Sequence, residues 1–476
     1  ILTPKEMLEG FSNKGMITVA LLFLVSEGIR QSGTLGQVIK KLLPQGKTTV
    51  FKAQLRILPS VAFISAFLNN TPVVVIFAPI IKHWAKSVNL PATKFLIPLS
   101  YVTILGGICT LIGTSTNLVV HGMILEAGFE GFSMFELGKV GIFIAIAGII
   151  YIFLFSKRLL PDARPDTAVP DEEVEEGEKL HRVEAVLGAR FPGINKKLKD
   201  FNFQRHYGAE VKEIKTRNGQ RFVTNLDDVV LHEGDTLVVM ADDTFIPTWG
   251  ESSVFVLLTN GNEPDTTGKK KRWFALLLLV LMIVGATVGE LPVTKEMFPD
   301  IKLDMFFFVS ITTIIMAWTN LFPARKYTKY ISWDILITIA CAFAISKAMV
   351  NSGVADSVAK FIIGLSDDYG PHVLLAMLFI ITNLFTELIT NNAAAALAFP
   401  LALSIASQLG VSPTPFFVVI CMAASASFST PIGYQTNLIV QGIGNYKFTD
   451  FVRIGLPLNI ITFLISIILI PLIWNF

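Results

Sequence analysis

The chain has 476 residues, of which 52% are hydrophobic and only 16% are charged, and its mean hydropathy is +0.59. Soluble domains carry roughly 25% charged residues, so this composition is typical of a membrane protein. The net charge of +2 argues against nucleic-acid binding, which requires a clustered basic surface, and the three scattered cysteines predict neither a disulfide framework nor a metal site.

Three interrupted apolar segments follow one another in the first half of the chain. The first carries Ser26-Glu27 and then Ser32-Gly33. The second has an apolar arm on each side of Asn69-Asn70-Thr71-Pro72, which predicts a helical hairpin that enters the membrane and turns back. The third, from Ile112 to Gly122, predicts a spanning helix broken at Gly113. A break at this depth is tolerated only where protein or a water-filled cavity satisfies the freed backbone groups.

A soluble insert interrupts the apolar pattern after the run from Met134 to Phe155, which is long enough to span a bilayer. Residues Val229 to Met240 predict a strand, a turn and a buried strand within a small α+β domain. Lys157-Arg158 and the run Lys269 to Arg272 flank the insert. Because basic residues near membrane ends mark the cytoplasmic side, we expect the insert in the cytoplasm and the protein in the plasma (inner) membrane.

The second half repeats the three interrupted segments in the same order. Ser346-Lys347 precedes Ser352-Gly353, Thr390-Asn391-Asn392-Ala393 forms the centre of a second hairpin, and Ile432 to Gly442 aligns with Ile112 to Gly122 without a gap. Other apolar runs predict plain spans, namely Trp273–Val288, Met305–Leu321, Ile331–Val350 and Ile454–Trp474. Paired Gly, Pro and Asn interruptions at corresponding positions of two halves indicate the binding site of a secondary transporter built from inverted repeats.

The predicted fold is therefore an α-helical polytopic membrane protein with two inverted repeats, each containing a re-entrant hairpin and a broken helix, plus a small α+β insert. Its predicted parts are a first transmembrane repeat (1–160), a linker with a regulatory-type domain (161–268) and a second transmembrane repeat (269–476). Because the chain opens with Ile1 and not Met, we expect the first repeat to be incomplete at its N-terminus.

The repeated motifs carry a family resemblance. The tips Asn69-Asn70-Thr71 and Thr390-Asn391-Asn392 resemble the paired Ser-Asn-Thr motifs of the divalent anion:sodium symporter family, which takes up di- and tricarboxylates or sulfate. Asn69, Thr390 and Asn392 depart from that motif, which leaves the substrate open. The segment Leu231 to Leu237 is similar to the C-terminal regulatory domain of potassium-uptake regulators, and this combination resembles the sulfate-type branch of the family.

Two sodium sites and one anion site follow as hypotheses. Sodium is a hard cation that prefers oxygen ligands, and a broken helix offers free carbonyls beside Asn and Thr side chains. The predicted sodium ligands are Ser65, Asn69, Asn70 and Gly113 in one site, and Thr386, Thr390, Asn391 and Gly433 in the other. The predicted anion ligands are Asn70, Thr71, Thr116, Asn117, Asn391, Asn392, Thr436 and Asn437, assisted by the positive ends of helices. The alternative is that these Asn and Thr residues only cap buried helix ends.

The favoured function is sodium-coupled uptake of a divalent anion by alternating access, with sulfate preferred over dicarboxylate. The helices beginning at Met16 and Met305 are expected to form a scaffold and a homodimer interface, and the insert is expected to bind an unidentified ligand. Glu387, a carboxylate in a hairpin arm, leaves open either a structural role or a sodium/proton antiporter or proton-coupled anion transporter. A regulated channel is less favoured because no Thr-Val-Gly-Tyr-Gly filter is present, and no enzyme motif is found.

Overall fold

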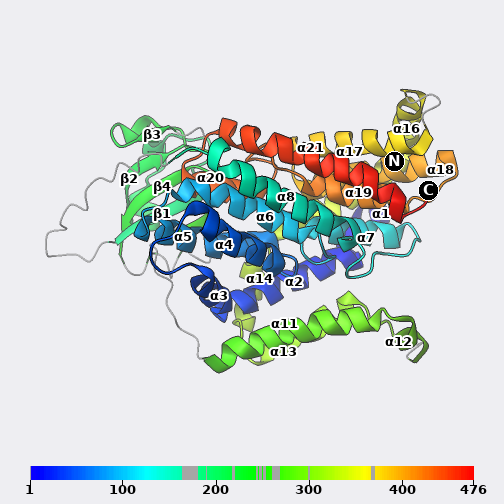
Figure 1. Ribbon diagram of the computed structural model, residues 1–476, viewed down its shortest axis with the longest axis horizontal. Helices are drawn as coiled ribbons and strands as arrows, with labels where there is room; N and C mark the ends of the chain where they lie inside the picture. Colours follow the sequence, from blue (N-terminus) through cyan, green and yellow to red (C-terminus); the bar gives the residue numbers. More distant parts are fainter. Residues whose placement is uncertain are drawn as a thin grey trace.

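The computed structural model describes residues 2–162, 181–188, 190–216, 220–242, 245, 249, 254–259, 269–297, 301–365 and 370–476. It is a mostly helical membrane protein with a small sheet at one end (Figure 1). Among the described residues, six helices are long and apolar enough to cross a membrane, and a bent pair, Ala324–Tyr330 with Ile335–Asn351, raises this to seven when it is taken as one span.

The first repeat contains eight of the described helices. They are α1 (Pro4–Glu9), α2 (Lys14–Gln31), α3 (Thr34–Leu42), α4 (Val50–Ser65), α5 (Asn70–Ser87), α6 (Leu96–Gly107), α7 (Ser115–Glu126) and α8 (Gly138–Leu159). The hairpin predicted around Asn70 is α4 followed by α5, and the predicted broken helix is α6 followed by α7. Both interruptions lie where the polar residues interrupt the apolar pattern.

The second repeat begins with four helices, α11 to α14, of which α12 and α14 are short, and then has the same order of elements as the first repeat. Its helices are α11 (Lys269–Gly289), α12 (Pro292–Met297), α13 (Met305–Trp318), α14 (Tyr327–Tyr330), α15 (Trp333–Asn351), α16 (Val354–Leu365), α17 (Gly370–Leu388), α18 (Asn391–Leu409), α19 (Thr414–Ser425), α20 (Gln435–Gly444) and α21 (Phe448–Ile473). Thus α15 to α21 correspond one by one to α2 to α8. Gly33 and Gly353 occupy equivalent turns with φ of 69° and 73°, a left-handed conformation that favours glycine.

The two repeats run in opposite directions. Helices α8 and α21 pack side by side, but α8 ends beside the insert whereas α21 ends at the opposite end of the molecule, near the C-terminus (Figure 1). Each hairpin also packs against the broken helix of the other repeat, α5 against α20 and α18 against α7. The fold is therefore an intertwined pair of inverted repeats.

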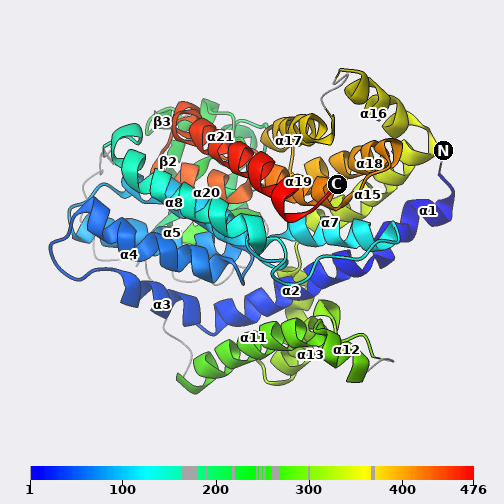
Figure 2. The ribbon, with the colours of Figure 1, turned by 45° about the vertical axis from the view of Figure 1, so that its right-hand side comes forward.

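The helices outside these units lie on one side. α13 packs on α2 and α11 on α13, and in both views α11, α12 and α13 form a group below the rest of the bundle (Figure 1 and Figure 2). Many apolar side chains of α11 and α13 are exposed, for example Leu281 and Ile314. Exposed apolar faces of this kind are expected in a chain whose surroundings are lipid.

The insert is a five-stranded antiparallel sheet with the strand order β3-β2-β4-β1-β5. Its strands are β1 (His181–Leu187), β2 (Glu210–Lys215), β3 (Arg221–Phe222), β4 (Thr236–Ala241) and β5 (Phe255–Thr259), with one short helix, α9 (Phe203–Tyr207). The aromatic side chains of this domain form a core of their own around Phe191. The predicted strand, turn and buried strand within 229–240 correspond to a bridge at Val230, a turn at Gly234 and β4.

The insert contacts the transmembrane part through charge and close packing. Lys82 of α5 forms an ion pair of 2.9 Å with Glu184 of β1. A Cβ added to Gly234 of the insert would lie 2.5 Å from the Leu438 side chain of α20, so the backbone of this turn is packed directly against that helix. The insert therefore contacts one arm of the first hairpin and one half of the second broken helix.

Candidate functional site

Both hairpins are closed by the same contact between their two arms. In the first, the Ser65 hydroxyl at the end of α4 lies 2.7 Å from the amide of Asn70 at the start of α5. In the second, the Thr386 hydroxyl lies 2.8 Å from Asn391 Oδ1. All four side chains are at least nine-tenths buried. The two predicted sodium clusters therefore have an equivalent hydroxyl and amide at their centres.

Both linkers of the broken helices are held by the same pair of residues. The side-chain amides of Asn117 and Asn437 donate to the carbonyls of Thr110 and Thr430, at 2.9 and 3.1 Å. The hydroxyls of these threonines accept from the amides at positions 113 and 433, at 3.1 and 3.3 Å. The same hydroxyls donate to the carbonyls at equivalent positions 66 and 387 of the hairpins. Each linker is thus fixed to the hairpin of its own repeat.

Thr110 and Thr430 are therefore structural members of the site that the sequence prediction missed. Extending the aligned strings Ile112–Gly122 and Ile432–Gly442 by two residues upstream would have paired them. Asn117 and Asn437, predicted as anion ligands, point into these linkers. Each is fully buried and donates to backbone carbonyls, so its position is that of a residue that shapes the loop.

The first cluster brings several oxygens around one amide. With its nitrogen directed inward, Asn70 lies 2.7 Å from Ser65 Oγ, 3.0 Å from the Thr103 carbonyl and 3.3 Å from the Gly113 carbonyl. A Cβ on Gly113 would stand 2.4 Å from the carbonyl oxygen of Gly107, so only glycine permits this close approach of the linker to the end of α6. Three of the four predicted ligands of this site, Ser65, Asn70 and Gly113, are together.

The second cluster repeats this arrangement with different side chains. The Thr386 hydroxyl also lies 2.6 Å from the Ala424 carbonyl, and a Cβ on Gly433 would stand 2.4 Å from the Thr386 carbonyl and 2.0 Å from Ser427 Oγ. Thr386, Asn391 and Gly433 are thus together. The hydroxyl of Ser427 stands at the position equivalent to Gly107 and adds one oxygen that the first cluster lacks.

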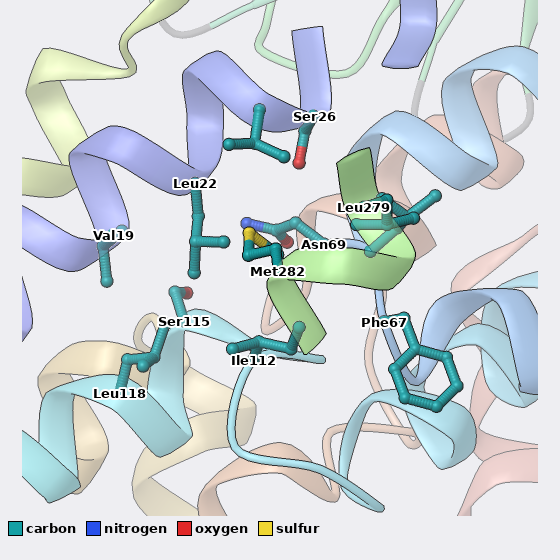
Figure 3. A pocket seen from close by; sticks show the side chains of 12 residues that line it. Val19, Leu22, Ser26, Phe67, Asn69, Ile112, Ser115, Leu118, Leu279 and Met282 are labelled. Atoms are coloured by element: carbon teal, nitrogen blue, oxygen red, sulfur yellow. The ribbon is translucent and has the colours of Figure 1, made fainter. Parts of the chain in front are cut away.

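The first residues of the two tip motifs lie elsewhere. Thr390 is the N-cap of α18, where its hydroxyl accepts from the amide of Ala393 at 3.4 Å. Asn69 is the N-cap of α5 but makes no side-chain cap, and its amide instead lines a pocket with Ser26 and Ser115 (Figure 3). The remaining lining comes mostly from apolar residues of α2, α11 and the first hairpin tip. Among the described residues, neither side chain joins the cluster to which the sequence assigned it.

The two tips meet each other across the centre of the molecule. The Thr71 hydroxyl lies 3.2 Å from Gln435 Oε1, and the Ser115 and Thr116 hydroxyls lie 3.2 and 3.3 Å from Asn392 Oδ1. Each tip therefore contacts the start of the broken half-helix of the other repeat. The N-termini of α5, α7, α18 and α20 converge here, and their partial positive charges make this region suitable for an anion.

Thr436 is turned away from this centre. It is fully buried, and its hydroxyl accepts from Ser100 of α6 at 2.9 Å. Of the eight predicted anion ligands, those whose side chains reach the interface between tips and half-helices are Asn70, Thr71, Thr116, Asn391 and Asn392.

Glu387 has a defined structural environment. Its Oε1 accepts from the Ser429 amide at 2.9 Å and from Asn459 Nδ2 of α21 at 2.8 Å, while its Oε2 is buried without a hydrogen bond among the described residues. The carboxylate thus ties the second linker to α21, and it lies beside the second cluster and not at the tip.

Comparisons with known proteins agree with this architecture. The family described as citrate transporter (CitMHS) matches residues 1–410 and 297–475. An uncharacterized transporter of Synechocystis sp. is 30% identical over 561 residues, covering 100% of this chain and 91% of the relative. Sodium/sulfate cotransporter 2 of Chlamydomonas reinhardtii is 31% identical over 281 residues, 59% of this chain and 31% of the relative.

A solved structure shares the fold. The crystal structure of the Alcanivorax borkumensis YdaH transporter has a TM-score of 0.55 to this chain, covering 98% of this chain and 86% of that one. The sequences are 11% identical, so this likeness concerns the arrangement of helices alone.

Proposed function

The chain belongs to the CitMHS family of citrate transporters, and on that premise we propose that it is a sodium-coupled symporter of a small divalent anion, with sulfate favoured. It is an integral membrane transporter and not an enzyme. The observation that carries the proposal is the pair of equivalent oxygen-rich clusters, one behind each hairpin tip, on either side of a centre where four helix N-termini converge.

The proposed cation sites use the clusters. Ser65, Asn70 and the Thr103 and Gly113 carbonyls would hold one sodium ion, and Thr386, Asn391 and the backbone around Gly433 would hold the second. Asn70 and Asn391 each belong to one cluster and to one tip. When such a side chain turns its amide oxygen towards a cation in the cluster, its amide nitrogen faces the tip. Sodium binding would then supply an N–H donor to the anion, which is a physical basis for coupling.

The proposed anion site lies between the two tips, where Asn70, Thr71, Thr116, Asn391 and Asn392 supply polar groups. The side-chain contacts described between tips and half-helices join neutral groups, so the affinity for a dianion depends on the sodium ions. Alternating access would follow from movement of hairpins and broken helices against the scaffold of α2, α11 and α13. Sulfate is favoured because relatives include a sodium/sulfate cotransporter. The homodimer remains a prediction.

The insert is proposed to be a cytoplasmic regulatory domain that resembles that of potassium-uptake regulators. Its contacts with α5 and α20 support this role, since both helices begin at the anion centre. A ligand that binds the insert with different affinity in the two transport states would bias their populations. Proton-coupled transport through Glu387 is the alternative proposal, supported by one oxygen of that carboxylate, which is buried without a hydrogen bond from the described part of the chain.

The experiment that tests the function is uptake of labelled sulfate into proteoliposomes with and without an inward sodium gradient, with succinate and citrate as competitors. We expect sodium-driven sulfate uptake with a sigmoidal sodium dependence, because two cations are proposed. Asn391→Ala should abolish it, whereas Asn351→Ala, at an exposed position at the end of α15, is the matched control.

Uptake driven by a proton gradient without sodium would overturn the sodium proposal in favour of the alternative. Full competition by succinate or citrate would instead move the substrate assignment to carboxylates.

A further inference from the structure

The two repeats differ in size and chemistry at one pair of equivalent residues, Thr114 and Tyr434. Each is the N-cap of a half-helix, with φ and ψ of −138° and 146° at Thr114 and −132° and 130° at Tyr434. Neither side chain makes a cap hydrogen bond to its own helix. Their hydroxyls lie 3.1 Å from each other. Two residues related by a pseudo-two-fold axis contact each other only near that axis, so this contact marks the centre of the molecule.

The Tyr434 hydroxyl also joins the two hairpins. It hydrogen-bonds the side chain of Asn70 from the first tip and lies close to that of Asn391 from the second. A threonine has no ring to reach across in this way, so the phenol of the second repeat alone brings a hydroxyl to both tip asparagines. The side chain is 9% exposed. It occupies the space between the residues proposed to hold sodium and the anion.

The next equivalent pair shows the same asymmetry. Gln435 of the second repeat stands where the first has Ser115, and both contact the opposite tip. The centre is therefore filled by longer side chains from the second repeat. The pocket beside the tips opens on the side of the smaller residue, where Ser115 lies with Asn69 and Ser26 (Figure 3).

We propose that Tyr434 is the specificity-determining residue of the anion site: its hydroxyl donates to the anion, and its ring limits the site to compact tetrahedral dianions of the sulfate class. This inference rests on the proposed function. A phenol O–H that donates to an anionic oxygen forms a charge-assisted hydrogen bond, which is about twice as strong as a neutral one. A four-carbon dicarboxylate or citrate needs more room between the tips, where the Tyr434 hydroxyl meets the side chain of Asn70.

Two substitutions separate the hydroxyl from the ring. Tyr434→Phe removes only the hydroxyl, and we expect the KM for sulfate to rise about tenfold, as for the loss of one hydrogen bond to a charged group. Tyr434→Thr recreates the residue of the first repeat and opens the centre. We expect succinate to compete with sulfate in this variant. The ratio of the half-inhibitory concentration of succinate to that of selenate, a tetrahedral dianion like sulfate, should fall about tenfold or more in the sulfate uptake assay, which is a discrimination that the size of a pocket can achieve.

The control is Tyr446→Phe, which removes the hydroxyl of another buried tyrosine. Tyr446 follows the C-terminal end of α20, and its hydroxyl contacts the backbone of Thr93 and Ile97. It should leave the selectivity ratio unchanged. Because the ratio is measured within each variant, lower amounts of folded protein do not affect it. If Tyr434→Thr does not fold, the isosteric Tyr434→Phe decides through the sulfate KM.

The outcomes are distinguishable from failure of the proposed function. A wild-type protein that shows no sodium-driven uptake of any of these anions contradicts the function itself. Sodium-driven sulfate uptake with an unchanged KM in Tyr434→Phe, or an unchanged selectivity ratio in Tyr434→Thr, overturns the role of Tyr434. Wild-type preference for citrate or succinate overturns the size argument.

Discussion

The clusters behind the two hairpin tips have the same arrangement of backbone, hydroxyl and amide groups, but different side chains support that backbone. The first uses Gly107 opposite Gly113, whereas the second uses Ser427 opposite Gly433. The hairpin of the first has Ala66 where the second has Glu387, and α5 carries Lys82 where α18 carries Leu403. Backbone geometry is therefore preserved between the repeats, while the side chains that support it are free to differ.

The largest effect is expected at position 107. A Cβ on Gly107 would stand 2.7 Å from Asn70 Oδ1 and 3.0 Å from the Gly113 carbonyl, so Gly107→Ala should displace the side chain of Asn70. We expect sodium-driven uptake to fall more than about 100-fold, because a displacement of about one ångström in a site can reduce its activity by this much. The equivalent Ser427→Ala keeps the Cβ already present and should change uptake by less than about tenfold, as for the loss of one hydrogen bond. Equal effects of the two, measured in proteoliposomes with matched protein amounts, would contradict the asymmetry.

A moderate effect is expected at Glu387. Its Oε1 accepts two hydrogen bonds, which the amide oxygen of Glu387→Gln can also accept, so uptake should fall by less than about tenfold. Glu387→Ala, which copies Ala66 of the first repeat, leaves the Ser429 amide and Asn459 without their acceptor and should lower the thermal stability. The pH dependence of uptake should be the same in wild type and Glu387→Gln. Loss of a pH dependence in Glu387→Gln would favour the proton-coupled alternative.

The smallest effect is expected where the insert meets α5. Burial of Glu184 favours its neutral form, but Lys82 and Lys215 more than compensate and hold its pKa at about 2. The pKa of Glu184 lies below its ordinary value of 4.5. The contribution of its ion pairs to the stability of the folded protein is therefore fully present above pH 4.5 and is lost as the pH falls towards 2. The contact should thus stay intact from pH 5 to 8.

Glu184→Gln removes the charge that pairs with Lys82 of α5 and with Lys215 of the insert. It should destabilise the insert and its docking on α5 together by about 1–3 kcal/mol, less than for a fully buried pair because Lys82 is partly exposed. We expect faster limited proteolysis of the insert and a changed maximal uptake rate with an unchanged sodium dependence. A changed sodium dependence would show that the insert acts on the cation sites directly.

Much of the fold and part of the candidate site could be predicted from local sequence. Gly33 and Gly353, the Asn pairs at the tips, and the Gly-to-Asn strings each mark a helix end by their own chemistry, and their equal spacing shows the repeat. The predicted hairpins, broken helices and small α+β insert are present for this reason. The pairing of Ser65 with Asn70 follows as well, since both lie within one hairpin.

The sequence by itself therefore determined the elements, their order and the inverted repetition, because glycine, proline and asparagine act on the backbone within a few residues. Only the tertiary structure decided that Asn69 and Thr390 lie outside the clusters, that Thr110 and Thr430 hold the linkers, and that Tyr434 stands at the centre. The contact of Tyr434 with Asn70 joins residues 364 positions apart. Such contacts depend on how whole helices cross between the repeats, which no local pattern encodes.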